Sequence, residues 1–167
     1  MVVASQMLGL AFFKAGKYPQ CYAVFGGERR GAPLFSFLRV DDKRILLKCE
    51  IKQAQELVCF DESIIDPEVV RSELVPGGRI LINTRQPAEA FKELQDYELH
   101  FFDAPAVSEA VGLGRIINTA MVGAYCRFMG HVELEYVLDA VGELAPAKRD
   151  ANIEAARQAF EATKARA

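Results

Sequence analysis

The stretch Phe-Gly-Gly-Glu-Arg-Arg-Gly-Ala-Pro at 25–33 holds the side chains best suited to binding an anion. Arg29 and Arg30 carry planar guanidinium groups, which can bind a phosphate or carboxylate through two parallel hydrogen bonds. The neighbouring glycines allow backbone angles closed to other residues and a close approach to a ligand. The pattern predicts either an anion clamp formed by Glu28, Arg29 and Arg30 on a mobile loop, or a surface turn in which Glu28 pairs with an arginine at little energetic gain.

A second candidate is Asn118, which lies in an apolar helical pattern over 105–129. Gly112 and Gly114 are predicted to interrupt this helix, and the interruption would place Asn118 near the start of its second half, among backbone N–H groups without helical partners. Gly112-Leu-Gly114 is not a dinucleotide fingerprint, because the third glycine and the preceding strand are missing. A buried amide needs hydrogen-bond partners, so Asn118 is expected either to hold a neighbouring loop or to face a ligand.

Two further polar residues stand at predicted element ends. Asp103 ends a strand-like run and Pro105 opens the next helix, at the kind of strand end where open α/β sheets bind ligands. Asn152 precedes an Ala- and Glu-rich helical stretch, and its residue type and position predict a helix N-cap.

The cysteine pattern argues against a metal centre on this chain. None of the four cysteines belongs to the Cys-x-x-Cys pairs that zinc and iron–sulfur sites commonly use. Each lies in an apolar run, so we expect four buried, reduced thiols in a cytosolic protein. His100 lies in a strand-like run and is expected to be structural. The cysteines are Cys21, Cys49, Cys59 and Cys126.

Composition limits the remaining choices. The chain has 167 residues, a length typical of one domain, and 51% are apolar, which is enough for a sizeable core. A net charge of −3 leaves no basic footprint for nucleic acid. No apolar run is long enough to cross a bilayer and no signal peptide is recognised, so a cytoplasmic location is expected.

The elements that would position these residues alternate along the chain. Several short apolar runs lack a period of two, which is typical of parallel strands covered on both faces by helices. A turn at 41–44 is expected to join 33–40 and 45–49 into a hairpin, which would make the sheet mixed. The expected strands are 20–25, 33–40, 45–49, 56–61, 79–84 and 97–104, and the expected helices are 2–15, 66–74, 105–129, 133–143 and 152–165.

Taken together, the sequence resembles the gamma subunit of the 2-oxoacid:ferredoxin oxidoreductases, of the pyruvate synthase or ketoisovalerate type. Gly-x-Glu-Arg-Arg-Gly is the most specific element of the resemblance, and the matching pieces run in family order over nearly the whole chain. The resemblance implies a single gamma-type domain over 1–167 with a three-layer α/β/α fold and a mixed, largely parallel sheet. The matching pieces are 4–18, 25–33, 74–84, 103–107, 118–125 and 152–156.

The resemblance also implies a function. It points to a subunit that has no catalytic residue or metal ligand and that helps to bind coenzyme A while a 2-oxoacid is oxidatively decarboxylated to an acyl-CoA. By position, the coenzyme A contacts would come from Glu28, Arg29, Arg30, Asn118 and Asn152. The implied partners are thiamine-binding alpha and beta subunits and a ferredoxin-like delta subunit, which would hold the thiamine diphosphate and the iron–sulfur clusters, with ferredoxin or a similar protein as electron acceptor. A homodimer is compatible with the isolated chain, and no nucleic-acid or membrane partner is implied.

One part of the family pattern is not found. The family has a strand and a Gly-Gly-Gln-Gly-like loop before the segment that matches 2–6, and Met1 falls where that loop should end. We therefore expect the first strand and the phosphate-binding glycines to be missing, which would leave a sheet edge open to pairing. Two alternatives stay open: a stand-alone module that binds coenzyme A or a nucleotide, and a structural subunit that has lost its ligand site.

Overall fold

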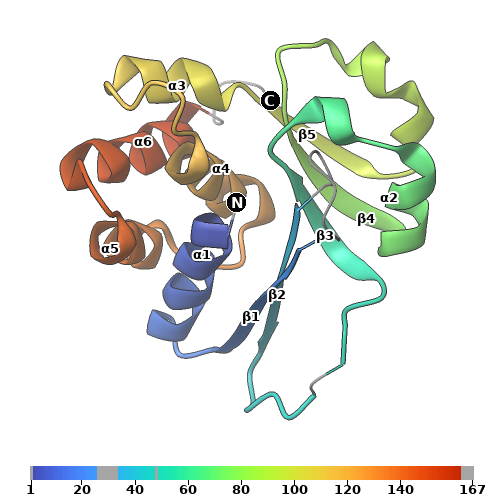
Figure 1. The fold of residues 1–167 in the computed structure, drawn as a ribbon, viewed down its shortest axis with the longest axis horizontal. Coiled ribbons are helices and arrows are strands. Elements are labelled where there is room, and N and C mark those ends of the chain that lie inside the picture. Colours follow the sequence, from blue (N-terminus) through green and yellow to red (C-terminus); the bar gives the residue numbers. More distant parts are fainter. Residues whose placement is uncertain (1, 26–33, 48, 163–167) are drawn as a thin grey trace. The chain divides into compact units, whose positions relative to one another are not determined.

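The computed structural model describes residues 2–25, 34–47 and 49–162. The chain divides into two compact units, each with a buried core of its own. Residues 1–47 and 105–167 form the first, which we call the helical unit, and residues 48–104 form the second, which we call the sheet unit. In Figure 1 the sheet unit is largely green, and the helical unit is blue and yellow to red. One gamma-type domain over 1–167 stays a prediction.

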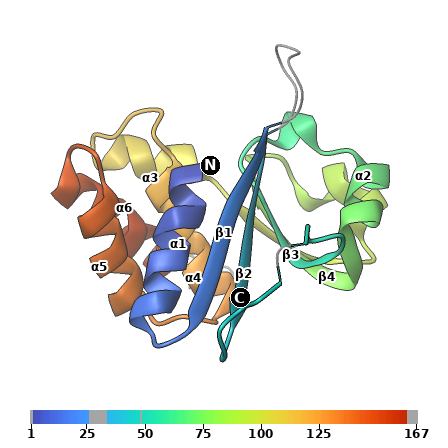
Figure 2. The ribbon, with the colours of Figure 1, turned by 60° about the horizontal axis from the view of Figure 1, so that its bottom comes forward.

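The helical unit begins with helix α1, Val2–Lys14, and an antiparallel hairpin of β1, Tyr18–Phe25, and β2, Leu34–Asp41. Figure 2 shows α1 running along this hairpin. The helix approaches one face closely at Gly9, where an added Cβ would lie 2.6 Å from the Cys21 sulfur. A side chain at this crossing would require the Cys21 sulfur to move, since the other neighbours of the added Cβ lie at 3.8 Å.

The hairpin differs from the predicted one. Residues 45–47 and 49 of the predicted strand are not in a strand, and residue 48 lies outside the described part. β2 pairs instead with β1, in an unbroken register from Tyr18 opposite Asp41 to Phe25 opposite Leu34. The turn predicted at 41–44 is present, since Asp41 accepts a hydrogen bond from the Lys43 N–H at 3.0 Å. The chain after it runs along the surface, where the Leu47 carbonyl accepts a bond from the side chain of Gln20 on β1.

The rest of the helical unit is a group of helices that pack on one another. The predicted helix over 105–129 is broken, as the glycines indicated: Gly112 and Gly114 both have left-handed backbone angles, with φ of 76° and 61°. Most of α4 is buried, and it packs against α6 at Gly123, where an added Cβ would overlap the Ala156 carbonyl. The helices are α3, Ala104–Ala110, α4, Asn118–Met129, α5, Leu134–Leu144, and α6, Arg149–Ala162.

The sheet unit is built on three parallel strands in the order β3–β4–β5. Helix α2, Pro67–Glu73, begins where Asp66 and Pro67 predicted it, with the Asp66 carboxylate accepting from the Glu68 N–H at 2.9 Å. Gly77 and Gly78, which follow the predicted helix 66–74, lie within β4. The remaining elements are β3, Ala54–Cys59, η1, Glu62–Ile64, β4, Leu74–Asn83, η2, Ala88–Leu94, and β5, Glu98–Phe102.

The predicted α/β class is confirmed, with both parallel and antiparallel strands. Within the residues that the structure describes, the antiparallel pair forms a sheet of its own rather than part of one mixed sheet. No helix in this described part is long and apolar enough to cross a membrane.

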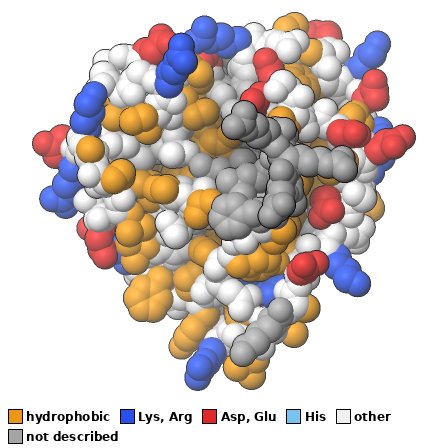
Figure 3. Space-filling model, in the orientation of Figure 1, with side chains coloured by type: hydrophobic (Ala, Val, Ile, Leu, Met, Phe, Trp, Pro, Cys, Tyr) orange, Lys and Arg blue, Asp and Glu red, His pale blue; other side chains and the backbone are white. Residues whose placement is uncertain are grey.

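Apolar side chains also reach the surface of the helical unit, as the orange areas on the left of Figure 3 show. Among the large ones, Leu46 is 79% exposed and Phe13 is 61% exposed. Tyr18, Leu47 and Leu144 are exposed as well. Large apolar side chains that are exposed singly are normal on a protein surface.

Candidate functional site

The predicted anion clamp lies outside the described residues. Glu28, Arg29 and Arg30 belong to the segment 26–33 that connects β1 to β2. The strand pairing ends at Phe25 and Leu34, the residues on either side of this segment. The role of these three residues stays a prediction.

Asn118 is the first residue of α4, as the interrupted pattern predicted. The preceding residue, Ile117, makes no capping hydrogen bond through its side chain, and its carbonyl accepts the first helical bond from Met121 at 3.0 Å. Helix α4 therefore starts without a polar cap from Ile117. Backbone N–H groups in a first turn carry partial positive charge and favour an anion nearby.

Asn152 is not an N-cap, so that prediction was wrong. Helix α6 begins at Arg149, and the Asn152 N–H already donates to the Lys148 carbonyl at 3.0 Å, as in the interior of a helix. The side chain is buried, with 5% exposure. Its amide nitrogen donates to the carbonyls of Ala147, at 2.9 Å, and Lys148, at 3.0 Å, so it holds the turn that precedes α6 instead of capping a helix start at 152.

The structure connects the residue that follows Asn118 to Asn152. The hydroxyl of Thr119, the residue after Asn118, donates to the Asn152 side-chain oxygen at 3.1 Å, and both Thr119 and Asn152 are buried between α4 and α6. On the same side, the Lys148 ammonium donates to the Gly112 carbonyl at 2.7 Å. We call Asn118, Thr119, Lys148 and Asn152 the α4-start cluster. Thr119 lies in the matching piece 118–125 but was given no role, and Lys148 lies in none of the matching pieces, so neither was predicted as a site residue.

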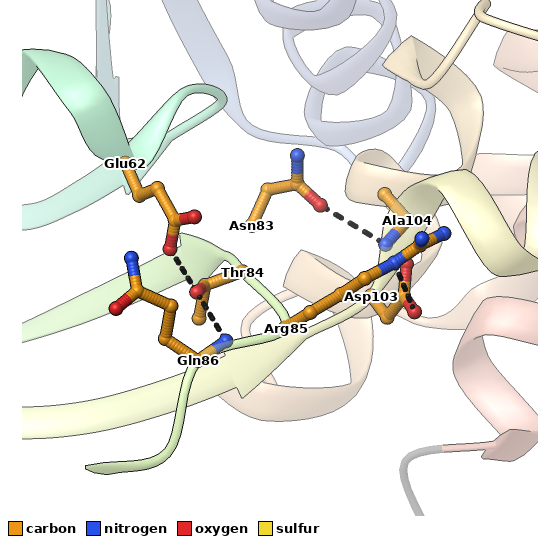
Figure 4. A network of polar contacts seen from close by, with 7 residues as sticks. All are labelled: Glu62, Asn83, Thr84, Arg85, Gln86, Asp103 and Ala104. Carbon is orange, nitrogen blue, oxygen red and sulfur yellow. Dashed lines mark hydrogen bonds and ion pairs between the residues drawn. The ribbon is translucent and has the colours of Figure 1, made fainter. Parts of the chain in front are cut away.

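A second polar group lies at the carboxyl ends of the parallel strands, within the sheet unit (Figure 4). We call it the strand-end network. Asn83, the last residue of β4, donates to the Phe60 carbonyl at 3.0 Å and accepts from the Ala104 N–H at 3.0 Å. One amide thereby joins the ends of β3 and β4 to Ala104, the last residue of the sheet unit. The network consists of Glu62, Asn83, Thr84, Arg85, Gln86 and Asp103.

The other members of the strand-end network are also paired with one another. The Thr84 hydroxyl donates to the Glu62 carboxylate and accepts from the Gln86 N–H. Arg85 donates to Asp103 at 2.9 Å, although its own side chain is 64% exposed. Of the six residues, only Asp103 was predicted from the sequence. A polar residue directly after each apolar run was the signal for the others, since parallel strands end at a common edge.

Comparison with known proteins decides the family. A family model described as pyruvate ferredoxin/flavodoxin oxidoreductase matches residues 1–162. The chain belongs to this family. The common gamma subunit of the pyruvate/ketoisovalerate oxidoreductases of Thermococcus kodakarensis is 38% identical, over 97% of the chain and 90% of that protein. Pyruvate synthase subunit PorC of Methanothermobacter marburgensis is 36% identical, over 98% of the chain and 90% of that protein.

Solved structures agree with this membership. The pyruvate oxidoreductase subunit PORC of Thermotoga maritima matches with a TM-score of 0.78 and 30% identity, over 95% of this chain and 86% of that one. A 2-oxoglutarate:ferredoxin oxidoreductase from Magnetococcus marinus matches with a TM-score of 0.72 at 14% identity, over 97% of this chain and 28% of that one. The second likeness concerns the fold alone. The predicted resemblance is confirmed: the chain is an oxidoreductase subunit of the gamma type.

The cysteines of this gamma subunit fall into two classes. Cys59 and Cys126 are buried as predicted, and their thiols donate to the carbonyls of Asp61 and Val132, each at 3.0 Å. Burial raises the pKa of each of these two thiols to about 11. The prediction was wrong for Cys21 and Cys49, which are exposed, because an apolar run on a hairpin or a surface segment need not enter a core.

The surroundings of His100 and of the other possible metal-binding side chains can also be described. His100 lies on β5 and its ring nitrogen is 2.9 Å from the Glu98 carboxylate, an arrangement that suits a structural role. Over residues 2–25, 34–47 and 49–162, no three His, Cys, Asp or Glu side chains are grouped so that they could hold a metal ion.

Proposed function

We propose that this gamma subunit binds coenzyme A at the start of α4, within an assembled 2-oxoacid:ferredoxin oxidoreductase. The observation that carries the proposal is the α4 start itself: two left-handed glycines lead into a helix whose first residue is Asn118 and whose N-cap residue makes no side-chain capping bond. Coenzyme A carries phosphate groups, and the partial positive charge of a helix start favours them. The family resemblance assigns a coenzyme A contact to Asn118, which stands at the first helical position.

The remaining predicted residues would have different roles. Glu28, Arg29 and Arg30 would act from the segment 26–33, with the arginines making charge-assisted hydrogen bonds to phosphate. Asn152 would act indirectly. Both atoms of its buried amide already have protein partners, so its contribution would be to hold Thr119 and the turn at 147–148 in place.

The partner subunits are the second part of the proposal. The relatives named above are called gamma or PorC subunits, which implies catalytic subunits beside them. The Magnetococcus protein, whose structure is described with coenzyme A and succinyl-CoA bound, contains the matching fold within a chain more than three times as long. We infer that thiamine-binding alpha and beta subunits and a ferredoxin-like delta subunit hold the thiamine diphosphate and the iron–sulfur clusters here.

In this arrangement the gamma subunit would take part in acyl transfer but not in decarboxylation. Coenzyme A supplies the thiol that accepts the acyl group when it is bound. The residues of this chain would hold its phosphates, so that the thiol end is presented to the partner subunits. Loss of these residues should therefore affect the use of coenzyme A and leave the earlier oxidation of the 2-oxoacid unchanged.

The test is a coenzyme A titration of the assembled enzyme with pyruvate as substrate. Replacing both Arg29 and Arg30 by Ala removes at least one charge-assisted hydrogen bond of about 1.5–3 kcal/mol, so the KM for coenzyme A should rise roughly ten-fold if one bond is lost and roughly a thousand-fold or more if both are. Arg→Lys at both positions should recover only part of this, because an ammonium cannot make the planar two-bond contact. Asn118→Ala should raise the same KM by about five- to ten-fold, the value of one hydrogen bond.

The control is the reduction of the clusters by pyruvate in the absence of coenzyme A, followed by stopped flow. It should be unchanged in all of these variants. An unchanged KM for coenzyme A in every variant would leave the chain as a structural subunit. Recovery of the chain from its native cell without thiamine- or cluster-bearing partners would instead favour a stand-alone module.

A further inference from the structure

The turn that precedes α6 contains an unusual backbone conformation. Lys148 has a φ of 49°, and among the described residues it is the one residue other than glycine with a positive φ. A side chain disfavours this left-handed region, so the surroundings must hold the residue there. The Asn152 side chain does so by donating to the Ala147 and Lys148 carbonyls on either side of the Lys148 N–H.

This conformation lets the Lys148 side chain meet the loop that leads into α4. Its ammonium donates to the Gly112 carbonyl at 2.7 Å, across 36 residues of sequence. Gly112 opens the loop between α3 and α4 and has a left-handed backbone itself. An exposed lysine usually samples many conformations, so a hydrogen bond to a backbone carbonyl restrains both the lysine and the loop.

The turn and the first residues of α6 therefore hold the segment from Gly112 to Thr119 at both of its ends. At the first end, the Lys148 ammonium donates to the Gly112 carbonyl. At the second end, the Asn152 side-chain oxygen accepts a hydrogen bond from the Thr119 hydroxyl. Between these points the loop is stabilised from inside, where Leu113 is buried and its N–H donates to the Ser108 carbonyl at 2.8 Å. Asn118 lies between the two restraints, one residue before Thr119.

We propose that Lys148 is a positioning residue for coenzyme A binding, which restrains the loop 111–117 so that Asn118 and the start of α4 face the ligand. The inference rests on the proposed function. The Gly112 carbonyl uses one of the three N–H donors of the ammonium, so the salt dependence and the Asn118→Ala background are used below to separate a positioning role from a direct phosphate contact. As a positioning residue, Lys148 should act through Asn118, and its effect should depend on Asn118 being present.

The experiment uses the assembled enzyme with three variants at this position. Lys148→Met removes the ammonium but keeps an unbranched apolar side chain, Lys148→Asn removes it while tolerating the left-handed backbone, and Lys148→Arg keeps a donor. Lys52→Met, at an exposed lysine in the sheet unit, controls for the loss of one positive charge. The two readouts are the kinetic constants for coenzyme A and the hydrogen exchange of backbone amides at 112–119.

We expect Lys148→Met and Lys148→Asn to raise the KM for coenzyme A about three- to ten-fold, with kcat within about two-fold and faster amide exchange at 112–119. Lys148→Arg should restore most of both, and Lys52→Met should change neither. In the Asn118→Ala background, Lys148→Met should add less than its effect alone, because coupled residues are not additive. An effect that adds in full and weakens with salt would show a direct phosphate contact and overturn the inference.

Failure of this inference can be told from failure of the proposed function. If Arg29→Ala with Arg30→Ala and Asn118→Ala raise the KM for coenzyme A but Lys148→Met and Lys148→Asn do not, the inference alone is wrong. If none of these variants changes the KM, the proposed site is wrong and the inference falls with it. Unchanged amide exchange in Lys148→Met would contradict the restraint of the loop whatever the kinetics show.

Discussion

The α4-start cluster and the strand-end network each contain an asparagine whose side-chain amide both donates and accepts a hydrogen bond. The two asparagines connect different parts of the fold. Asn152 is 5% exposed and joins a helix interior to a turn and to a neighbouring helix. Asn83 is half-buried and joins elements that meet because parallel strands end at one edge. Burial makes the first arrangement costly to disturb, whereas water can replace part of the second.

The two groups differ in how much structural precision they need. The strand-end network includes Arg85, with a 64% exposed side chain, so small shifts can be absorbed there by solvent. In the helical unit, α4 and α6 approach so closely that Gly123 has no room for a methyl group beside Ala156. The position of the start of α4, and of any ligand site there, therefore depends on the close packing of α4 against α6.

The largest expected effect comes from Gly123→Ala. The new methyl group would overlap the Ala156 carbonyl oxygen and lie 2.7 Å from its carbon, and backbone cannot move aside as a side chain can. We expect a loss of about 3 kcal/mol or more in the free energy of unfolding of the helical unit. Urea unfolding of the purified subunit, followed by circular dichroism, measures it.

Gly142→Ala on α5 is the matched control. Its methyl group would meet only side chains, those of Ile153 and Arg149, at 3.0–3.2 Å. These can shift, and alanine favours a helix over glycine by about 1 kcal/mol, so stability should change by less than about 1 kcal/mol. A cost for Gly142→Ala as large as that for Gly123→Ala would show that the α4–α6 contact is not special.

The buried thiols allow each unit to be followed separately. Cys126 lies in the helical unit and Cys59 in the sheet unit, both are buried, and the raised pKa of about 11 keeps both thiols protonated and slow to react at pH 8. In the native protein we expect iodoacetamide to react with exposed Cys49 well before either buried thiol. Reaction at Cys59 and Cys126 should accelerate as the pH rises towards 11. Gly123→Ala should accelerate the reaction of Cys126 more than that of Cys59, as mass spectrometry of the labelled peptides can show.

The second largest effect is expected for Asn152→Ala. It leaves the buried Thr119 hydroxyl and the turn carbonyls without their amide partner, at a cost of about 2 kcal/mol in the free energy of unfolding. Thermal and urea unfolding measure this cost. Asn152→Ala combined with Thr119→Val should cost less than the sum of the two single changes, because the two side chains share one hydrogen bond. Full additivity would argue against the contact.

A smaller effect is expected for Asn83→Ala. The change removes a bond to the Phe60 carbonyl and the bond that accepts from the Ala104 N–H, but water can reach this half-buried place. We expect a loss of about 1 kcal/mol, and less than for Asn152→Ala. The same unfolding experiments compare the two variants directly. A loss for Asn83→Ala equal to or greater than that for Asn152→Ala would reverse the comparison.

The smallest effect is expected for Arg85→Ala. The Arg85–Asp103 pair is largely exposed, and such pairs contribute about 0–0.5 kcal/mol. The free energy of unfolding of Arg85→Ala is compared with that of the unchanged protein at low salt and at about 1 M salt, where the screening length is about 3 Å. We expect the two proteins to differ at low salt and to be equal at high salt. A loss above about 1 kcal/mol that persists at high salt would mean that Arg85 has a role beyond this ion pair.

Much of the fold could be predicted where local signals and tertiary contacts agree. Asp66 and Pro67 start α2 because their residue types suit a helix start in any surroundings. Gly112 and Gly114 interrupt the helical pattern, and Asn118 is the first residue of the helix that follows, as predicted. The apolar runs at β3, β4 and β5 formed parallel strands because their side chains suit burial on both faces.

The rest depended on which segments meet. Residues 45–47 are as apolar as a strand, yet β2 pairs with β1 and not with them. Composition therefore does not decide which segments pair; the register between two strands does. Asn152 has the residue type of an N-cap, but the cap position depends on the backbone at Lys148, which no local pattern reveals. Cys21 lies in an apolar run on a hairpin that leaves it exposed.

By itself, the sequence determined the family, the α/β class and the positions of most helices and strands, since these depend on residue types, spacing and motifs. Only the tertiary structure decided that Thr119, the neighbour of Asn118, bonds to Asn152 and that Lys148 reaches the loop before α4. The physical reason is that hydrogen bonds act over about 3 Å and between residues far apart in the chain. Such contacts exist only once helices α4 and α6 have packed together.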